Sequence, residues 1–172
     1  MPNSPKAFTL ANSAILGQLI TPCEVSAAYN PSTLSGSAPI RKQFMGLWDT
    51  GASGTVITNR VATALGLVPS GMCKSYHAQG VSNVNTYFVN IILLNGIQVH
   101  SLRVFEGNLP GGIDLLIGMD IISLGDFSIT HKNGGTVFSF QIPSTHEYDF
   151  VKQVQNGVGT KQKRKKPKKR KR

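Results

Sequence analysis

Residues 47–58 have the sequence LWDTGASGTVIT, in which an aspartate interrupts two apolar segments. Strands rarely carry aspartate in their interior, and removing a carboxylate from water costs free energy unless it is paired or hydrogen-bonded. We therefore expect Asp49 to lie in a turn between two strands. It is either an ordinary turn residue or the residue for which the segment exists, and the rest of the chain decides between these interpretations.

The composition predicts one neutral domain with a basic tail. A chain of 172 residues, 40% of them hydrophobic, has room for one domain with its own core. The net charge of +10 is concentrated at one end, because residues 161–172 contain ten of the 18 lysines and arginines and no acidic residue. The other 160 residues carry eight basic and eight acidic side chains. Arguments about binding to polyanions therefore concern the tail alone.

Cysteine usage and the N-terminal segment predict an intracellular protein. Cys23 and Cys73 do not form a disulfide framework and lack the spacing of a zinc site, so we expect free thiols in a reducing compartment. Polar residues interrupt the apolar stretch near the N-terminus, which is a poor signal-peptide core, and no apolar run is long enough to span a membrane. We expect a cytoplasmic location, or a nuclear one in a eukaryote because of the basic tail.

Short apolar runs bounded by glycine, proline, asparagine and serine recur along the chain, which is typical of a mainly β protein. We expect strands at residues 14–20, 23–29, 41–49, 54–58, 96–106, 113–117, 126–130 and 136–142.

Turn and helix signals divide these strands. Residues 59–67 have apolar side chains at helical spacing and end at Gly66, which predicts a short helix. A second short helix is expected between Gly118 and Gly125. Residues 76–94 alternate in polarity around Gly80 and predict a hairpin with that glycine at its tip. The Asn-Gly pairs at residues 95–96 and 133–134 favour two-residue hairpin turns.

The order of these features resembles the retroviral-type, or retropepsin-like, aspartic protease family. Its members have two apolar residues before Asp-Thr-Gly-Ala, then a flap hairpin, then two apolar residues and a glycine before a helix. Here the apolar pair precedes Asp49, Gly80 marks the hairpin, and the sequence DLLIGMD (residues 114–120) supplies the late glycine, Gly118. The resemblance covers about residues 40–140 and is closest to the cellular, non-viral branch.

The resemblance implies a mainly β, single-lobe closed β-barrel with one or two short helices and a flap hairpin. It divides the chain into N-terminal strands and a loop, partly outside the match, then a protease domain, a linker, and a disordered polybasic tail. The corresponding boundaries are residues 1–39, 40–145, 146–160 and 161–172.

The chemistry of this family explains the residue types in the Asp49 turn. Two nearby carboxylates share one proton because like charges at that distance cannot both ionise. The ionised carboxylate takes a proton from water, and the protonated one donates a hydrogen bond to the scissile carbonyl. The resemblance makes Asp49 the catalytic residue, with Thr50 and Gly51 completing the active-site loop. Gly51 permits backbone N–H groups to approach the carboxylate, and the Thr50 hydroxyl would lock two such loops together.

The resemblance also implies the surroundings of the catalytic loop. A peptide substrate would bind between the loop and the flap, and no metal or other cofactor is expected. Gly118 would have a structural role, packing against the loop. The expected substrate-binding residues are Ala52, Ser53, Gln79, Gly80, Val81 and Leu116.

Only one aspartate of the chain is followed by Thr-Gly or Ser-Gly, because Asp114, Asp120 and Asp126 lack such a sequence. The second carboxylate must then come from a second copy related by two-fold symmetry. The sequence therefore predicts a homodimer that hydrolyses peptide bonds.

The sequence departs from the family pattern at three positions. Trp48 is bulkier than the usual aliphatic residue, so the packing behind the loop is expected to differ. Ser53 and Met119 stand where viral members often place an acid and an arginine that form an ion pair. Both partners of that pair are absent here.

Three alternatives remain open from the sequence. The domain is an active endopeptidase, a catalytically inactive module that dimerises or binds peptides, or a scaffold in a protein whose main function is to bind nucleic acid. In each case the basic tail contributes a non-specific electrostatic contact with nucleic acid or another anionic surface. It contains no aromatic residue for base stacking.

Overall fold

The computed structural model describes residues 4–77 and 80–157. The strands are β1 (Lys6–Asn12), β2 (Ile20–Ala27), β3 (Lys42–Trp48), β4 (Val56–Ile57), β5 (Gly71–His77), β6 (Gly80–Ile92), β7 (Gln98–Glu106), β8 (Leu115–Ile117), β9 (Asp126–Thr130) and β10 (Thr136–Ile142). The helices are α1 (Asn59–Leu65), α2 (Met119–Ile122) and α3 (Phe150–Gly157), with short 3-10 turns η1 (Leu94–Gly96) and η2 (Lys132–Gly134). The prediction of a mainly β protein with few short helices is confirmed.

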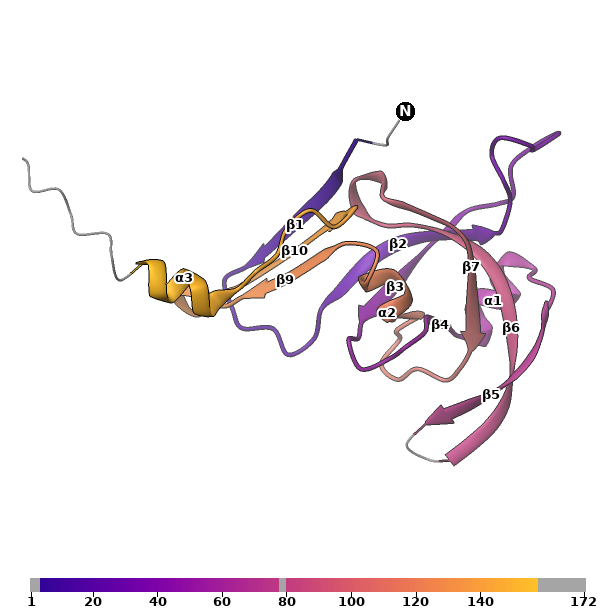
Figure 1. Cartoon of the computed structure of the whole chain (residues 1–172). Helices are drawn as coiled ribbons and strands as arrows, with labels where there is room; N and C mark the ends of the chain where they lie inside the picture. The colour runs from indigo at the N-terminus through magenta and orange to yellow at the C-terminus, as the bar shows by residue number, and fades with distance from the viewer. Residues whose placement is uncertain (1–3, 78–79, 158–172) are drawn as a thin grey trace, which may run out of the picture.

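The larger sheet curls into a barrel-like ring. Its strand order is β2-β3-β8-β4-β7-β6-β5, and a further antiparallel pairing joins β6 back to β2, with Val25 opposite Ile91. The pairings therefore form a ring from which β5 is excluded (Figure 1). The fully buried aliphatic side chains of the core include Val25, Ile57, Val89, Ile91, Val104, Leu115 and Ile117.

A second, three-stranded sheet with the order β1-β10-β9 lies beside the ring (Figure 1). Its buried face is aromatic, and Trp48 at the end of β3 packs into it. The Trp48 ring centroid lies 5.1 Å from that of Phe138 and 5.0 Å from that of Phe140. Burying side chains of this size gives a large hydrophobic contribution. Trp48 thus ties the ring to the second sheet immediately before Asp49.

The strand β8 lies between β3 and β4. It runs parallel to β3, with Trp48 beside Ile117, and antiparallel to β4, with Val56 beside Leu116. Residues 49–55 connect β3 to β4, so this loop must cross the end of β8. The crossing brings Gly118, the residue after β8, against the Asp49 loop.

Most of the local sequence signals are confirmed. Helix α1 follows Thr58 and ends at Gly66, whose φ of 61° is the left-handed conformation that glycine adopts easily. The turn after β6 has positive φ at Asn95 and Gly96, 53° and 68°. Positive φ at both central residues is the geometry that an Asn-Gly hairpin turn favours.

The predicted strand at residues 14–20 is wrong. The backbone N–H of Ala14 donates to the Asn12 side chain, 2.8 Å, and that of Leu16 donates to Thr136 Oγ1, 2.9 Å, so a loop begins after Asn12. The preceding strand, β1, was not predicted because Phe8 is its only buried residue. A strand with one buried side chain has no alternating pattern to detect.

The predicted hairpin is present as β5 and β6, but its first strand begins at Gly71 rather than at residue 76. His77 pairs with Gly80, and Gly80 has a φ of 125°, which strongly favours glycine. Residues 78–79 lie outside the described part of the chain. Figure 1 shows the hairpin extending from the ring.

A carboxylate anchors the base of this hairpin. Glu106, the last residue of β7, accepts hydrogen bonds from the Tyr87 hydroxyl, 2.6 Å, and from Asn85 Nδ2, 2.9 Å, both on β6. The Tyr87 hydroxyl is the largest cause that lowers the pKa of Glu106 below its ordinary value, followed by the Asn85 amide. The contacts favour the ionised form of Glu106 and fix β6 to β7.

We predict that Glu106→Gln lowers the stability of the protein at neutral pH. A lowered pKa stabilises the folded state above the unfolded-state pKa of about 4.3 and loses that contribution as the pH falls through the folded-state pKa. The stability difference between wild type and Glu106→Gln should therefore be largest near neutral pH and shrink in acid, as measured by urea unfolding at several pH values. Glu147→Gln, at an exposed position, is the control. A difference independent of pH would contradict the prediction.

The C-terminal part of the described chain includes α3, which lies in the segment predicted as a linker. Residues 161–172, predicted to be disordered, lie outside the described residues. Within residues 4–77 and 80–157, no helix combines the length and the apolar character needed to cross a membrane.

Candidate active site

Asp49 lies in a tight turn at the end of β3 and is half-buried. Its backbone N–H donates to the Ile117 carbonyl, 3.0 Å, and its carbonyl accepts the Ala52 N–H, 3.3 Å. The carboxylate oxygen Oδ1 accepts the Gly51 N–H at 2.8 Å. A Cβ on residue 51 would lie 3.2 Å from the same oxygen, so glycine gives the N–H close access. The other carboxylate oxygen accepts no hydrogen bond from any residue that the structure describes.

Gly118 packs against the backbone of the Asp49 loop. A Cβ at this position would lie 2.7 Å from both the carbonyl carbon and the oxygen of Gly54, and 3.0 Å from the Ala52 oxygen. No real Cβ tolerates the closest of these distances, and the obstructing atoms are backbone. The next residue, Met119, donates its N–H to the Ala52 oxygen, 2.8 Å. Gly118 thus packs against the loop that carries Asp49.

Thr55 and Asp120 fasten the far end of the loop to α2. Asp120 accepts the Thr55 backbone N–H, 2.8 Å, and the Thr55 hydroxyl, 2.7 Å. The same hydroxyl accepts the Gly118 N–H, 3.2 Å. Thr55 is fully buried, with 0% of its surface exposed, so each of these polar groups needs its partner. No local sequence signal links Thr55 to Asp120, which are 65 residues apart.

We predict that Thr55→Val lowers the free energy of unfolding by about 2 kcal/mol, because it removes a buried hydrogen bond to a charged group and leaves the Gly118 N–H without its acceptor. Urea unfolding measures the change. Thr33→Val, at an exposed position, is the matched control and should have little effect. Equal stability of the two variants would show that the hydroxyl of Thr55 does not hold the loop.

Trp48 sets the packing behind the loop. It is 6% exposed, and its ring N–H donates to the Thr21 hydroxyl at 2.9 Å. The bulk of this residue is therefore accommodated by the aromatic sheet and by a polar partner on β2. The indole N–H of a buried tryptophan requires such an acceptor.

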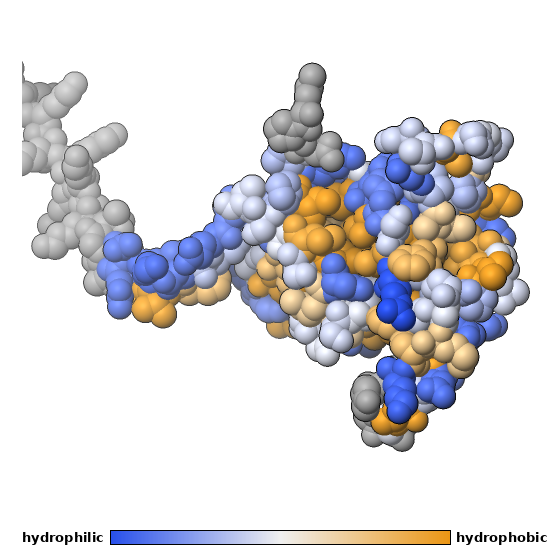
Figure 2. Space-filling model, turned by 45° about the vertical axis from the view of Figure 1, so that its right-hand side comes forward, coloured by the Kyte–Doolittle hydropathy of each residue, from blue (hydrophilic) through white to orange (hydrophobic). Residues whose placement is uncertain are grey.

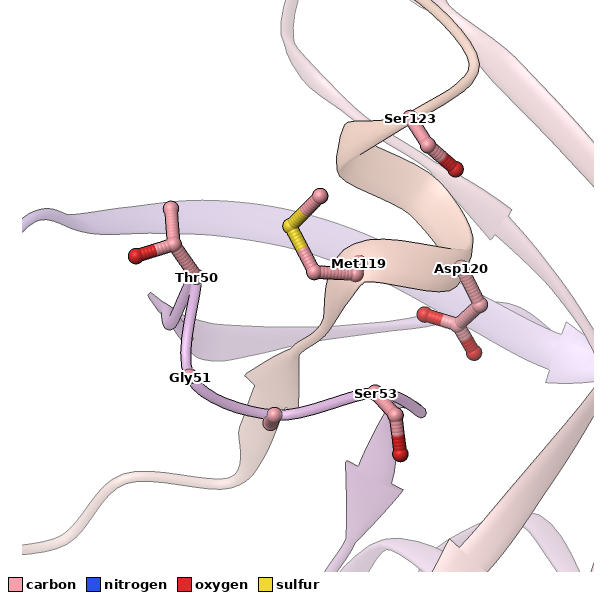
Figure 3. Close-up of a pocket in the computed structure, with 7 residues that line it drawn as sticks. Thr50, Gly51, Ser53, Met119, Asp120 and Ser123 are labelled. Atoms are coloured by element: carbon pink, nitrogen blue, oxygen red, sulfur yellow. The ribbon is translucent and has the colours of Figure 1, made fainter.

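Two hollows flank the Asp49 turn. One, of about 400 Å³, lies between the loop and α2. Figure 3 shows Thr50, Gly51 and Ser53 on the loop and, across from it, Met119 and Asp120 of α2 and Ser123 at its end. The other, of about 340 Å³, includes Asp49 itself. It is lined by Leu16, Gly17, Gln18, Leu19, Leu47, Trp48, Asp49, Thr50, Ile129 and His131. The loop that replaces the expected strand at residues 14–20 therefore forms one wall of the hollow beside the carboxylate.

The structure brings together only some of the residues assigned to the site from sequence. Thr50 and Ser53 are exposed and Ala52 is half-buried, and all three line the hollow beside α2. Leu116 is half-buried between β3 and β4 and lines neither hollow.

The flap residues are separate from the loop in this single chain. Gly80 and Val81 are exposed on the hairpin. Among the residues that the structure describes, no hydrogen bond joins either of them to the Asp49 turn. Gln79 lies outside the described residues.

A buried carboxylate, paired with an exposed arginine, fixes the start of β8. Asp114 is 2% exposed and pairs with Arg60 of α1. Its carboxylate also accepts the Met45 N–H at 3.0 Å, and its carbonyl accepts the Thr58 N–H at 3.0 Å. Asp114 therefore joins α1, β3 and β8, and such a buried carboxylate is costly to leave unpaired. It was noted in the sequence only as an aspartate without Thr-Gly.

The described residues show neither a metal site nor a reactive thiol near the loop. They include no group of three or more His, Cys, Asp or Glu side chains placed to hold a metal ion. Cys23 is a free, buried thiol, and burial, aided by the charge of Asp114, raises its pKa to about 12. A thiol with such a pKa is not a nucleophile at neutral pH.

Comparison with models of known protein families identifies the family to which the chain belongs. A sequence model described as aspartyl protease matches residues 32–121, which is more than half of the chain. No curated protein sequence is significantly similar to the chain.

Solved structures of retropepsin-like proteins are also similar. A retropepsin-like aspartic protease from Rickettsia conorii has 14% identity and a TM-score of 0.46, covering 81% of this chain and 95% of its own. The retroviral protease-like domain of Ddi1 from Leishmania major has 17% identity and a TM-score of 0.41, covering 72% and 95%. The protease of simian foamy virus has 14% identity and a TM-score of 0.39, covering 59% and 89%.

The matched segment contains the Asp49 turn, the hairpin and Gly118, the features from which the resemblance was inferred. The chain belongs to the aspartyl protease family and has the retropepsin-like arrangement of an Asp-Thr-Gly loop crossed by a late glycine.

Proposed function

We propose that the protein is an aspartic endopeptidase that acts as a homodimer, with Asp49 of each copy forming the catalytic pair. The observation that carries this proposal is that only one oxygen of the half-buried Asp49 carboxylate has a hydrogen-bond partner among the described residues. One oxygen is held by the Gly51 N–H, and the residue is half-buried beside a hollow of about 340 Å³. An aspartate with only a structural role would be expected to have both oxygens bound, as Asp120 does.

The catalytic steps follow from two such carboxylates on a symmetry axis. Their proximity leaves one proton shared between them. The ionised Asp49 removes a proton from water as that water attacks the peptide carbonyl carbon. The protonated Asp49 of the other copy donates a hydrogen bond to the carbonyl oxygen. The Asp49 that took the proton from water then passes it to the amide nitrogen, and the tetrahedral intermediate collapses to a carboxylic acid and an amine.

Dimerisation is supported by the loop itself. The chain carries a single Asp-Thr-Gly sequence. Thr50 is exposed beside Asp49, and its hydroxyl finds no hydrogen-bond partner within residues 4–77 and 80–157. The same residue of a second copy would supply that partner across the axis.

Substrate binding would use an extended peptide between the loop and the hairpin. Ala52 and Ser53 would contact its main chain. Gly80, Val81 and Gln79 would close over it and exclude water. Leu116 lies behind the loop, so its effect on a subsite would pass through Leu47 or Val56, beside which it pairs.

The test combines cleavage with oligomeric state. Purified protein is incubated with a diverse peptide mixture between about pH 3.5 and 7.5, and the products are identified by mass spectrometry. If the dimer is the active form, the rate per chain should fall on dilution in parallel with the dimer fraction measured by analytical ultracentrifugation. Cleavage by a monomer would overturn the two-copy site. No cleavage by a dimeric sample would favour the inactive peptide-binding module.

A further inference from the structure

The helix α3 carries an apolar face that the rest of the described chain does not cover. Phe150, Val151 and Val154 are 69%, 66% and 67% exposed. Their spacing of one and four residues places them on one side of a helix. Lys152, Gln153, Gln155 and Asn156 provide the polar side. In Figure 2 the helix stands out from the body, with its apolar side along one edge.

The attachment of α3 to the domain is well defined. Asp126 of β9 accepts the backbone N–H groups of Thr145 and His146, both at 3.0 Å, and His146 Nδ1 lies 2.9 Å from the same carboxylate. The ring of Tyr148 then stacks on that of His146, with centroids 5.8 Å apart. These contacts fix the direction in which the chain leaves the second sheet.

The start of α3 is capped. The Asp149 carboxylate accepts the Lys152 N–H at 3.0 Å, and the Asp149 carbonyl accepts the Gln153 N–H at 3.0 Å. A helix of eight residues is nevertheless marginal in water without packing. An exposed apolar face on such a helix therefore indicates a surface that becomes covered.

The sequence after α3 indicates what covers it. Only residues 158–160 separate the helix from the run 161–172, with its ten lysines and arginines. An amphipathic helix followed by a polybasic segment combines two membrane-binding contributions. Apolar side chains enter the boundary between headgroups and acyl chains, and basic residues bind anionic headgroups.

We propose that Phe150, Val151 and Val154, together with the basic residues of 161–172, form an anchor that binds the surface of an anionic membrane. This anchor does not depend on the peptidase activity. It would hold the enzyme at the membrane surface, where its substrates would be proteins bound to or exposed at that surface.

Nucleic acid is the alternative binding partner of this region, and it explains only one of the two features, the basic tail. Counterion release explains how a basic tail binds RNA, but it gives no role to the apolar face of α3. A second copy of the chain would cover the apolar face but would give the tail no anionic surface to bind, because the other 160 residues of each copy carry as many basic as acidic side chains. An anionic lipid surface satisfies both features.

The experiment compares full-length proteins for binding to vesicles of phosphatidylcholine with about one third phosphatidylserine, at about 100 mM salt. The variant Phe150→Ser/Val154→Ser removes apolar surface from the exposed face. Gln153→Ser/Gln155→Ser changes the same number of residues on the polar face and is the matched control. In a third variant, glutamine replaces the ten basic residues of 161–172.

We expect the first and third variants each to bind vesicles at least about tenfold more weakly than wild type, and the control to bind within about twofold. Unchanged binding by Phe150→Ser/Val154→Ser would overturn the proposal, because the tail would then act alone. If wild type bound vesicles of pure phosphatidylcholine as tightly as vesicles with phosphatidylserine, the proposal that the anchor needs an anionic surface would be overturned. Tight binding to single-stranded RNA without vesicle binding would assign the tail to nucleic acid. Loss of the dimer in the serine variant would assign the apolar face to a second copy.

Discussion

Asp49→Asn is expected to lower peptide cleavage by about 10⁴-fold while leaving the fold unchanged. The amide has the same shape as the carboxylate, and its oxygen still accepts the Gly51 N–H. It cannot take a proton from water or share one with a second carboxylate. The variant should therefore unfold at the same urea concentration as wild type and form the same dimer, while mass spectrometry detects no products.

A mixing experiment distinguishes a shared site from two independent ones. If each dimer needs both aspartates, a tenfold excess of Asp49→Asn should trap most wild-type chains in inactive heterodimers and leave roughly a tenth of their activity. If each chain is active alone, the excess variant should leave the activity unchanged. Residual cleavage by Asp49→Asn itself, above the rate of a mock purification, would refute the role of Asp49.

Gly118→Ala is expected to destabilise the protein by about 3 kcal/mol and to remove the activity with it. The new methyl group would meet the Gly54 carbonyl group at 2.7 Å and the Ala52 oxygen at 3.0 Å. All of these atoms are backbone of the loop that carries Asp49, so no side chain can rotate away. The loop or β8 would have to move, and either movement would displace the Asp49 carboxylate.

The matched control for this substitution is Gly71→Ala in β5. The nearest atom to a Cβ there is Thr86 Oγ1 at 3.7 Å, an ordinary contact distance. Gly71→Ala should leave the urea midpoint nearly unchanged. If Gly118→Ala were as stable as Gly71→Ala, the loop would accommodate the methyl group without a loss of stability. The crossing of the Asp49 loop over the end of β8 would then not be rigid.

The parts of the site that could be predicted from sequence are those with a local signature. Asp49 and Gly118 were found because a polar or flexible residue interrupts an apolar strand at a recognisable place. The helix ending at Gly66 and the Asn-Gly turns were found because the conformation of each depends on a few neighbouring residues.

The parts that were missed depend on contacts between distant segments. Thr55 and Asp120 are 65 residues apart in sequence, and each alone is unremarkable in a strand or a short helix. The role of Arg60 becomes visible only when α1 is placed beside the buried Asp114. The strand β1 was overlooked because its only buried side chain is Phe8, and the pairing with β10 that makes it a strand comes from the other end of the chain.

The crossing of the Asp49 loop over the end of β8 would also determine when the proposed activity can appear during protein synthesis. The contacts that hold the loop join Thr55 to Gly118 and Asp120, across 63 and 65 residues. A ribosome-bound chain that has not yet extruded this later segment lacks the support of its Asp49 loop, and closing such long loops is slow compared with local folding. If the protein is a peptidase, as proposed, a nascent chain would therefore not cleave the proteins around it until most of its domain has been made and folded.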